Sequence, residues 1–414
     1  MRTWTAPELP VLPGQGEAPR LFNTATGRLE HPAIEHNRAT LYVCGITPYD
    51  ATHLGHAATY LAFDLMLRAW RDAGIETEYA QNITDVDDPL LERATATGAD
   101  WRALADSQIA LFRSDMFQLG MIPPDSYVAV TECIDEIAAA VDRLRSVGLA
   151  YEVPTADAPG NDLYFDTLAA TNQTEWRLGD VAPIDRATML QLSAERGGDP
   201  ERTGKRDPLD PLLWRAQREG EPSWDTVVGP GRPGWHIECS VIATRALGNT
   251  FTVQGGGADL VFPHHEFTAA HSTAATGTPL AHAYCHVGLL SYQGHKMSKS
   301  RGNLVLVSNL LEAGADASAI RLGMLAHHYR AEWEWFDEDL QTASRRLAAW
   351  RQGLRSPAQD PVASEDVLRQ LRQALANDLD TPVMLAVLDS ALDRGVDDPA
   401  LISDAARALL GIVI

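Results

Sequence analysis

The chain has 414 residues and a mass of 45.1 kDa, a length that suggests two or three domains. Its 45% hydrophobic and 22% charged residues are typical of a globular protein and exclude wholesale disorder. The formal net charge of −22 argues against a large nucleic-acid footprint, because such a surface is normally basic. No apolar run is long enough to span a membrane, and residues 1–15 lack an apolar signal core, so we expect a cytoplasmic protein.

The first predicted element is a buried strand over residues 39–45, which a loop connects to a helix over about residues 53–73. Gly74 favours the end of this helix. A second strand is expected at about residues 77–83. A strand, a helix and a strand in this order imply a parallel sheet with a right-handed crossover.

The remaining pattern predicts a helix over residues 90–119 and then a mixed, loop-rich stretch that indicates a domain inserted into the sheet. Further strands are expected at residues 250–254 and 283–290, and nearly all of the sequence from about residue 308 favours helices. The predicted fold class is therefore α/β, a Rossmann-type parallel sheet with an inserted domain and a C-terminal helical region. The expected units are the first half of the sheet domain (1–125), the inserted domain (126–215), the second half of the sheet domain (216–307) and the helical region (308–414).

Four cysteines are widely spaced along the chain and do not indicate a disulfide framework. They are Cys44, Cys133, Cys239 and Cys285. On spacing alone, a buried thiol, a zinc ligand and a catalytic thiol remain open for each of them.

The sequence His53-Leu54-Gly55-His56 lies where the first strand is followed by its helix. A helix N-terminus offers free N–H groups and a positive dipole end, which favour a phosphate, and Gly55 permits close approach of a nucleotide. Taken alone, these residues could equally be a solvated helix start.

A second cationic loop follows far along the chain, in residues 295–303 (HKMSKSRGN). Lys296 and Lys299 could clamp a triphosphate and balance the charge that develops as pyrophosphate leaves. A solvated basic turn is the alternative, but it loses weight because the histidine motif occurs in the same chain.

Together the two motifs resemble the HIGH and KMSKS signatures of class I aminoacyl-tRNA synthetases, with Leu54 in place of isoleucine. The resemblance implies a Rossmann-type domain that joins a carboxylate to ATP and releases pyrophosphate. It also implies that His53 and His56 stabilise the ATP phosphates, that Lys296 and Lys299 close over the β- and γ-phosphates, and that Mg²⁺ accompanies ATP.

A zinc site is the third expectation, built from Cys44, Cys239 and His264. Two cysteines and a histidine from three segments could hold a tetrahedral zinc ion with one open position, although the spacing is not that of a zinc finger. On spacing alone, Cys239 could be a core thiol and His264 a loop residue.

The segments around these residues resemble the zinc-binding parts of cysteinyl-tRNA synthetases. This resemblance implies that Cys44, Cys239 and His264 bind one zinc ion, which takes the thiolate of substrate cysteine. Thr268 stands where the synthetases carry a fourth, glutamate ligand, so a site with three protein ligands is expected; substitution by Glu266 or His265 is the alternative. The residues expected to bind cysteine or the adenylate are Cys44, Gly45, Ile46, Thr47, Thr59, Asn82, Ile83, Thr84, Trp235, Gly257, Ala258, Asp259 and Leu290.

The acceptor of the activated cysteine is the last question. Residues 195–200 (ERGGDP) and Pro89 resemble the family of ligases that join cysteine to glucosaminyl-inositol in mycothiol synthesis. An acidic, lysine-free tail over residues 360–414 is also a poor surface for a tRNA. The resemblance implies a monomeric enzyme whose substrates are L-cysteine, ATP and the amine of glucosaminyl-inositol, with no nucleic-acid or membrane partner. The alternative is a cysteinyl-tRNA synthetase.

Overall fold

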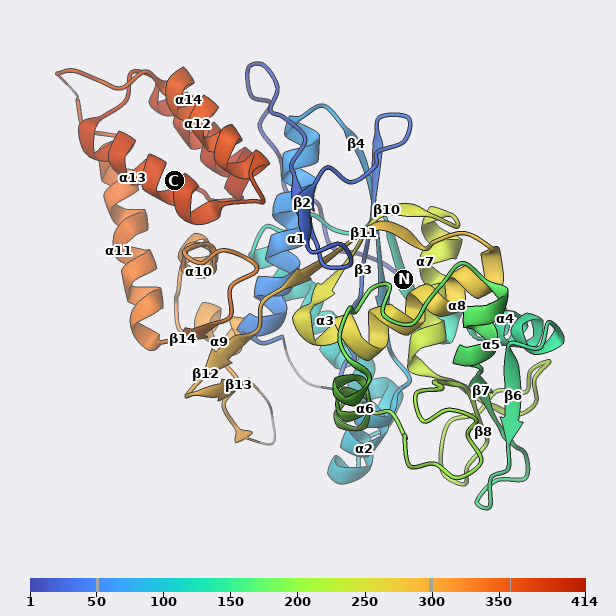
Figure 1. The fold of residues 1–414 in the computed structure, drawn as a ribbon. Coiled ribbons are helices and arrows are strands. Elements are labelled where there is room, and N and C mark those ends of the chain that lie inside the picture. Colours follow the sequence, from blue (N-terminus) through green and yellow to red (C-terminus); the bar gives the residue numbers. More distant parts are fainter. Residues whose placement is uncertain (50–51, 298–300, 358) are drawn as a thin grey trace.

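A computed structural model describes residues 1–49, 52–297, 301–357 and 359–414 (Figure 1). Its central feature is a five-stranded parallel sheet in the order β11-β10-β3-β4-β5. The strands are β3 (Arg38–Val43), β4 (Glu76–Ile83), β5 (Ser126–Ala129), β10 (Phe251–Gly257) and β11 (Ala281–Val287). The predicted parallel α/β sheet is thereby confirmed.

Helices cover both faces of this sheet. On one face lies α1 (Leu54–Asp72), which contacts β3, β4, β10 and β11; on the other lies α7 (Trp235–Leu247), which contacts β3 and β4. Side chains alternate along a strand, and accordingly Leu41 and Val43 of β3 join the core on the α1 side while Tyr42 and Cys44 join the core on the α7 side. This alternation places Cys44 against α7.

The predicted helix over residues 90–119 is wrong, because two helices occupy the segment: α2 (Asp88–Thr97) and α3 (Trp101–Gln118). Gly98 ends α2 in the left-handed region at φ 65°. The side chain of Asp100 then accepts a hydrogen bond from the Ala103 amide at 2.9 Å and begins α3. Gly98 and Asp100 are visible in the sequence as a helix end and a helix start, but the apolar pattern that runs across both helices favoured a single helix.

A separate antiparallel sheet, in the order β6-β7-β8-β9, lies beside the parallel one (green to yellow in Figure 1). Its strands are β6 (Ala150–Val153), β7 (Asp162–Phe165), β8 (Leu212–Ala216) and β9 (Gly231–Pro233), and helices of this part of the chain are α4 (Ile134–Ser146), α5 (Thr167–Gln173) and α6 (Arg186–Glu195). Strand β5 pairs with the parallel sheet and β9 with the antiparallel one. The limits of the inserted domain at residues 126 and 215 stay a prediction.

Short strands and irregular turns complete the sheet domain. They are β1 (Leu21–Asn23), β2 (Arg28–Glu30), β12 (Leu290–Tyr292), β13 (His295–Lys296), β14 (Trp333–Trp335), η1 (Val130–Glu132), η2 (Ala258–Leu260) and η3 (Val261–His265), with helix α8 (Glu266–Thr276). Strand β12 pairs with both β13 and β14. This small sheet carries the first part of the predicted lysine loop.

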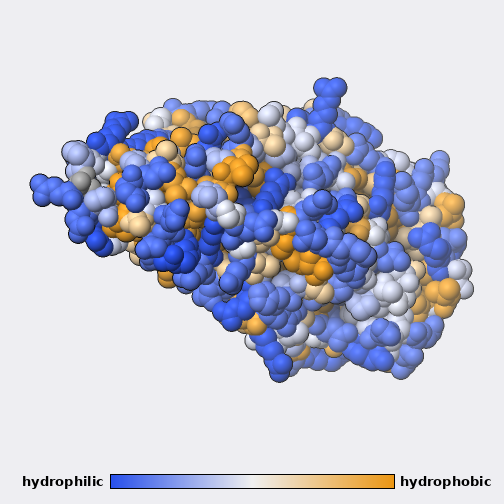
Figure 2. Space-filling model, turned by 90° about the horizontal axis from the view of Figure 1, so that it is seen from above, coloured by the Kyte–Doolittle hydropathy of each residue, from blue (hydrophilic) through white to orange (hydrophobic). Residues whose placement is uncertain are grey.

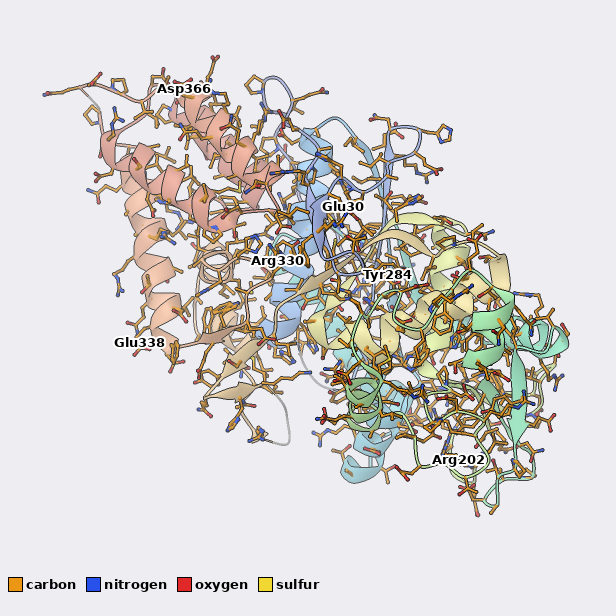
Figure 3. All side chains as sticks on the ribbon, viewed as in Figure 1. Glu30, Arg202, Tyr284, Arg330, Glu338 and Asp366 are labelled. Atoms are coloured by element: carbon orange, nitrogen blue, oxygen red, sulfur yellow. The ribbon has the colours of Figure 1, made fainter. Side chains whose placement is uncertain are left out.

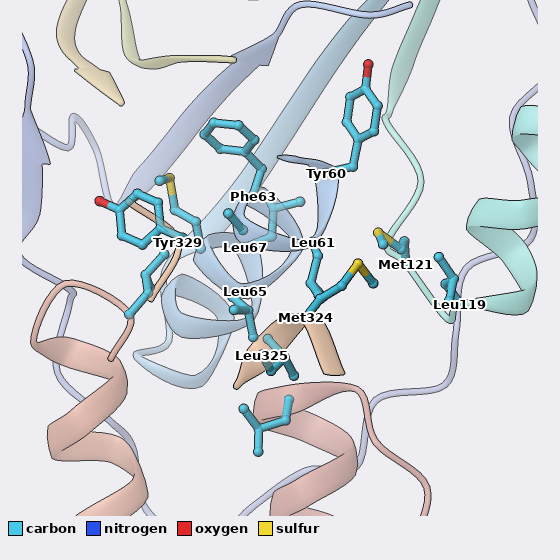
Figure 4. Packing of buried hydrophobic residues seen from close by; sticks show 14 of the residues in the cluster. Tyr60, Leu61, Phe63, Leu65, Leu67, Leu119, Met121, Met324, Leu325 and Tyr329 are labelled. Carbon is cyan, nitrogen blue, oxygen red and sulfur yellow. The ribbon is translucent and has the colours of Figure 1, made fainter. Parts of the chain in front are cut away.

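The C-terminal helical region lies on the far side of α1 from the sheet (orange and red in Figure 1). It contains α9 (Val307–Glu312), α10 (Ala317–Leu325), α11 (Asp337–Gly353), α12 (Ser364–Ala376), α13 (Thr381–Arg394), α14 (Pro399–Ala405) and η5 (Ala406–Leu410). Leu61 and Leu65 of α1 pack in one core with Met324 and Leu325 of α10 (Figure 4). The helical region is therefore continuous with the core that supports α1.

A buried charge network joins α1 to this region. The carboxylate of Asp64 accepts hydrogen bonds from Arg68 Nε at 2.8 Å and from Arg321 Nη2 at 2.6 Å. The same guanidinium groups donate to carbonyls of residues 407, 408 and 410 in η5. Burial alone would raise the pKa of Asp64, but Arg68 and Arg321 lower it, so the carboxylate is charged and paired on both sides.

On the face shown in Figure 2, apolar side chains form separate groups among polar ones. Figure 3 shows Glu338 and Asp366 on the helical region and Arg202 on the antiparallel unit. No described helix combines the length and the apolar character needed to cross a membrane.

Candidate active site

The candidate site lies at the carboxyl ends of β10, β3 and β4, which are adjacent in the sheet. Ligands of open parallel sheets bind at this edge. The Cys44 amide donates to the Gly255 carbonyl at 3.1 Å, which holds the loop after β3 against β10. Gly255 itself admits no side chain, because a Cβ would lie 2.3 Å from the Phe63 ring of α1. The sheet edge and α1 are thereby packed closely at the site.

The two histidines of the first motif begin α1. His53 is the N-cap, and its Nδ1 accepts a hydrogen bond from the Gly55 amide at 3.1 Å. The rings of His53 and His56 stack with centroids 3.8 Å apart. A Cβ on Gly55 would lie 2.9 Å from the His53 ring, so the motif needs glycine here.

Both histidines are neutral at physiological pH. Burial, followed by His56 and Lys296, lowers the pKa of His53 to about 2; burial and Lys296 lower the pKa of His56 to about 4. The buried Nδ1 of His56 has no hydrogen-bond partner among the described residues. A neutral imidazole in this position can orient a phosphate by hydrogen bonding without carrying charge.

Lys296 lies at the same edge. Its Nζ is 2.6 Å from Oδ2 of Asp259, which lies two residues after the end of β10. The structure thus brings together one predicted phosphate-binding lysine and one residue predicted to border the adenylate. Lys299, the second predicted lysine, lies outside the described residues.

Asn303 is a supporting residue that sequence reasoning missed. Its side-chain amide donates to the carbonyls of Tyr292, Lys296 and His295 at 2.8, 3.3 and 3.4 Å. Two residues after Asn303, the Val305 carbonyl accepts a hydrogen bond from the Leu54 amide of α1 at 2.9 Å. The end of the lysine loop is therefore attached to the start of α1. The adjacent glycine and asparagine at 302–303 are a frequent turn pair, and this pair was the only sequence feature that could have pointed to Asn303.

Asn82 organises the loops after β3 and β4. Its Oδ1 accepts hydrogen bonds from the Gly45 amide at 2.8 Å and the Tyr42 hydroxyl at 3.0 Å, and its Nδ2 donates to Thr84 at 3.1 Å. A Cβ on Gly45 would lie 1.6 Å from the Asn82 carbonyl oxygen. These contacts fix the backbone beside the candidate nucleotide site.

The other predicted binding residues divide into two groups. The side chains of Ile46, Ile83 and Leu290 are buried in the core beside α1. Thr47 and Thr59 are half-buried, and Gly257 would place a Cβ 2.7 Å from Oδ1 of Asp259 and 4.0 Å from Oγ1 of Thr59. Ala258 begins η2, between Gly257 and Asp259. Gly257, Asp259 and Thr59 therefore lie together at the edge of the sheet, where Asp259 pairs with Lys296.

A metal-binding constellation lies on the α7 side. The ligand atoms of Cys44, Cys239 and His264 all lie within 4.8 Å of one another, and all three side chains are buried. Sγ of Cys239 is 3.9 Å from Sγ of Cys44 and 3.3 Å from Nε2 of His264. Tetrahedral zinc with bonds of about 2.0–2.3 Å needs ligand atoms roughly 3.3–3.8 Å apart. The three residues therefore fit a zinc ion.

Residues around the three ligands set their orientation. His264 Nδ1 is 3.0 Å from His236 Nδ1, and the indole of Trp235 stacks on the His264 ring at a centroid distance of 4.2 Å. Burial, with Cys44 nearby, raises the pKa of the Cys239 thiol; a divalent cation would oppose this rise because the thiolate is its ligand.

The residues considered as a fourth ligand make other contacts in the structure. Thr268 donates its hydroxyl to the His264 carbonyl at 2.6 Å. His265 Nε2 lies 3.2 Å from Sγ of Cys44, and its Nδ1 lies 2.8 Å from Nε2 of His286. His265 is thus a neighbour of a ligand and stands outside the three-residue group.

Glu266 instead fastens the antiparallel unit to the site. Its two carboxylate oxygens accept hydrogen bonds from the Trp176 indole and from the amides of residues 179, 181 and 182, at 2.9–3.1 Å. Burial raises the pKa of Glu266 to about 7 against the effect of these donors. The sequence carried no signal for this clamp, because its partners are mostly backbone amides.

The predicted segment 195–200 also reaches the site. Arg196 Nη1 donates to the carbonyls of Asp259 and Phe262 at 2.6 and 2.5 Å. Two attachments, one through Glu266 and one through Arg196, thus hold the antiparallel unit against the segment that carries Asp259 and His264.

Comparison with known proteins identifies the class to which this fold and site belong. Residues 30–345 match the family of tRNA synthetases class I (C), catalytic domain. The fold is similar to that of Mycobacterium tuberculosis methionyl-tRNA synthetase in complex with methionyl-adenylate, with a TM-score of 0.62 over 90% of this chain and 92% of that one, at 15% identity. The protein has a class I synthetase catalytic fold.

Curated relatives define the family more closely. The chain is 56% identical to the L-cysteine:1D-myo-inositol 2-amino-2-deoxy-alpha-D-glucopyranoside ligase of Clavibacter michiganensis, over 100% of this chain and 99% of the relative. It is 53% identical to the ligase of that name from Micrococcus luteus, over the same shares of the two chains. The chain belongs to this ligase family.

Proposed function

We propose that this protein is an ATP-dependent ligase that activates L-cysteine as cysteinyl-AMP and joins it to the amine of 1D-myo-inositol 2-amino-2-deoxy-alpha-D-glucopyranoside (GlcN-Ins), a step of mycothiol synthesis. The observation that carries the proposal is the placement of Cys44, Cys239 and His264 at the same sheet edge as His53, His56 and Lys296. The names of relatives that match the whole chain support the acceptor.

Cysteine recognition is assigned to the three metal ligands. When bound, zinc supplies a soft Lewis acid that takes a thiolate far better than a hydroxyl, which separates cysteine from serine. Cys44, Cys239 and His264 would hold the ion, and it would supply this affinity for the substrate thiolate. Trp235 fixes the His264 ring by stacking, and Thr47 and Thr59 are proposed to line the amino-acid pocket.

Activation is assigned to the nucleotide-binding residues. A cysteine carboxylate oxygen attacks the α-phosphorus of ATP, and pyrophosphate leaves with the electron pair of the broken P–O bond. His53 and His56 hold the phosphates by hydrogen bonds, and Lys296, together with Lys299 and a Mg²⁺ ion bound to ATP, balances the charge of the leaving group. Before ATP binds, Asp259 holds Lys296 at this edge through the 2.6 Å ion pair.

The second step forms the amide. The neutral amine of GlcN-Ins attacks the carbonyl carbon of cysteinyl-AMP, loses a proton, and AMP departs. An acidic protein suits an acceptor that carries one ammonium group and disfavours a tRNA polyanion. We further propose a cytoplasmic monomer without a nucleic-acid partner, and four free, buried cysteines fit a reducing compartment.

The test is an acceptor comparison. Protein, ATP and radiolabelled cysteine are incubated with GlcN-Ins or with cysteine tRNA, and the labelled products are separated. We expect Cys-GlcN-Ins and no more labelled tRNA than a tRNA of another specificity gives. Efficient charging of cysteine tRNA without use of GlcN-Ins would instead identify a cysteinyl-tRNA synthetase. Absence of any cysteine-dependent pyrophosphate exchange would overturn both activities.

A further inference from the structure

Arg196 links the antiparallel unit to the irregular backbone between the two halves of the site. It comes directly after α6, and its Nη1 donates to the carbonyls of Asp259 and Phe262 at 2.6 and 2.5 Å. Charge-assisted bonds of this length are among the stronger polar contacts in proteins. Arg196 therefore fixes two points of one short segment.

That segment connects the phosphate side of the site with the metal side. Asp259, at its start, pairs with Lys296, and His264 comes two residues after Phe262. The backbone between them leaves the helical path at Phe262, with φ −138° and ψ 135°. Because a regular helix does not set its shape, the separation of Asp259 from His264 depends on contacts from outside the segment.

The other end of the 195–200 segment is anchored in the antiparallel sheet. The Asp199 carboxylate accepts hydrogen bonds from the Tyr164 hydroxyl of β7 and from Lys205 Nζ, the latter at 2.8 Å. The Gly198 amide donates to the Ser193 carbonyl at 2.8 Å, and a Cβ at Gly198 would lie 2.2 Å from Oγ of Ser193. The glycine turn and the aspartate thus hold the segment on α6 and β7 while Arg196 reaches the site.

We propose that Arg196 is a positioning residue that sets the separation between Asp259 and His264, and so brings Lys296 and the metal ligands into register for cysteine activation. The inference rests on the proposed function. Arg196 acts through these residues, because its hydrogen bonds go to the backbone carbonyls of Asp259 and Phe262. Through Arg196, the 195–200 segment therefore contributes to the first half-reaction, the activation of cysteine, in addition to any contribution to acceptor binding.

The experiment compares Arg196→Met, which keeps an unbranched apolar stem but removes the donors, with Arg196→Lys, which restores charge and N–H groups. Arg186→Ala is the matched control, because Arg186 lies on the same helix α6 and pairs with Asp207 instead of the site. Each protein is assayed for cysteine-dependent ATP–pyrophosphate exchange, for zinc affinity by competition with a chromophoric chelator, and for thermal unfolding.

We expect Arg196→Met to lower kcat/KM for exchange about ten- to a hundredfold and to weaken zinc binding several-fold, from the loss of two charged hydrogen bonds. Arg196→Lys should recover a large part of both, and Arg186→Ala should match the wild type. Should Arg196→Met fail to fold, Tyr164→Phe, which loosens the anchor at Asp199, should lower the exchange rate in the same direction to a smaller extent.

If a folded Arg196→Met protein keeps the wild-type exchange rate and zinc affinity, the inference is overturned and the proposed function stands. If Tyr164→Phe is used instead, an unchanged exchange rate has the same meaning. If the wild-type protein itself showed no cysteine-dependent exchange, the proposed function would be wrong, and the zinc affinities of the same variants would still test the role of Arg196.

Discussion

The ammonium of Lys296 lies 2.6 Å from the carboxylate of Asp259, beside the stacked imidazoles that begin α1. Both groups are partly exposed, so the pair is open to exchange with a solvent-borne ligand. An ATP phosphate entering the site could take the position of the carboxylate around Lys296. The pair therefore marks the place where we expect the charge of the leaving group to be balanced.

Replacing Lys296 with alanine should slow cysteine-dependent pyrophosphate exchange by about a hundredfold, with a smaller rise in the KM for ATP, because the compensated charge peaks in the transition state. Steady-state exchange kinetics provide the measurement. Lys296→Arg keeps the charge and serves as the control, which should retain more activity than alanine. A change limited to KM would contradict the role given to this lysine.

Replacing Cys239 with alanine should abolish stoichiometric zinc binding and cysteine activation while ATP binding persists, since one of three protein ligands is lost. Metal content by mass spectrometry and nucleotide affinity by calorimetry measure the two effects. Cys285→Ala is the matched control, because Cys285 is equally buried on β11 but lies outside the ligand group. Zinc content equal to that of the wild type would exclude the site.

The low pKa of His56 predicts a pH dependence of stability. Its pKa is about 4 in the folded chain and near 6.5 in the unfolded one, so the unfolded state takes up the proton first as the pH falls. The contribution of His56 is complete above pH 6.5 and declines towards pH 4, by up to about 1.4 kcal/mol per pH unit. Thermal unfolding of wild type and His56→Asn over this range measures it. The Tm of the variant should fall less, and parallel curves would contradict the prediction.

Replacing Glu266 with glutamine should lower the free energy of unfolding by about 1–3 kcal/mol, because an amide nitrogen would face N–H donors in a buried place. Chemical denaturation provides the measurement. Glu195→Gln is the control, since Glu195 is exposed and bonds only Gln191 among the described residues. Equal unfolding free energies for the two variants would show that the four-donor clamp contributes little.

The order of strand, helix and strand predicted the parallel sheet and the start of α1. The meeting of Cys44, Cys239 and His264 was expected only from the resemblance to cysteinyl-tRNA synthetases, because their spacing left a core thiol and a loop histidine equally open; the structure brings the three together. The histidines and Lys296 also lie at one sheet edge, as parallel topology requires.

Other features depend on partners that no local pattern announces. Glu266 and Arg196 bind backbone groups of distant segments, and a backbone N–H or carbonyl looks the same at every position of a sequence. The break between α2 and α3 was visible in Gly98 and Asp100, but the apolar periodicity on either side masked it. Long-range contacts to the main chain are what sequence reasoning lacks here.

The buried network of Asp64, Arg68 and Arg321 has a consequence for how the enzyme is made. Asp64 lies on the helix that His53 and His56 begin, and its arginine partners donate to carbonyls of η5. During synthesis α1 leaves the ribosome more than three hundred residues before η5 does. Until Leu410 has emerged, the arginines lack these acceptors, so helix α1 reaches its final surroundings only after η5 has been synthesised.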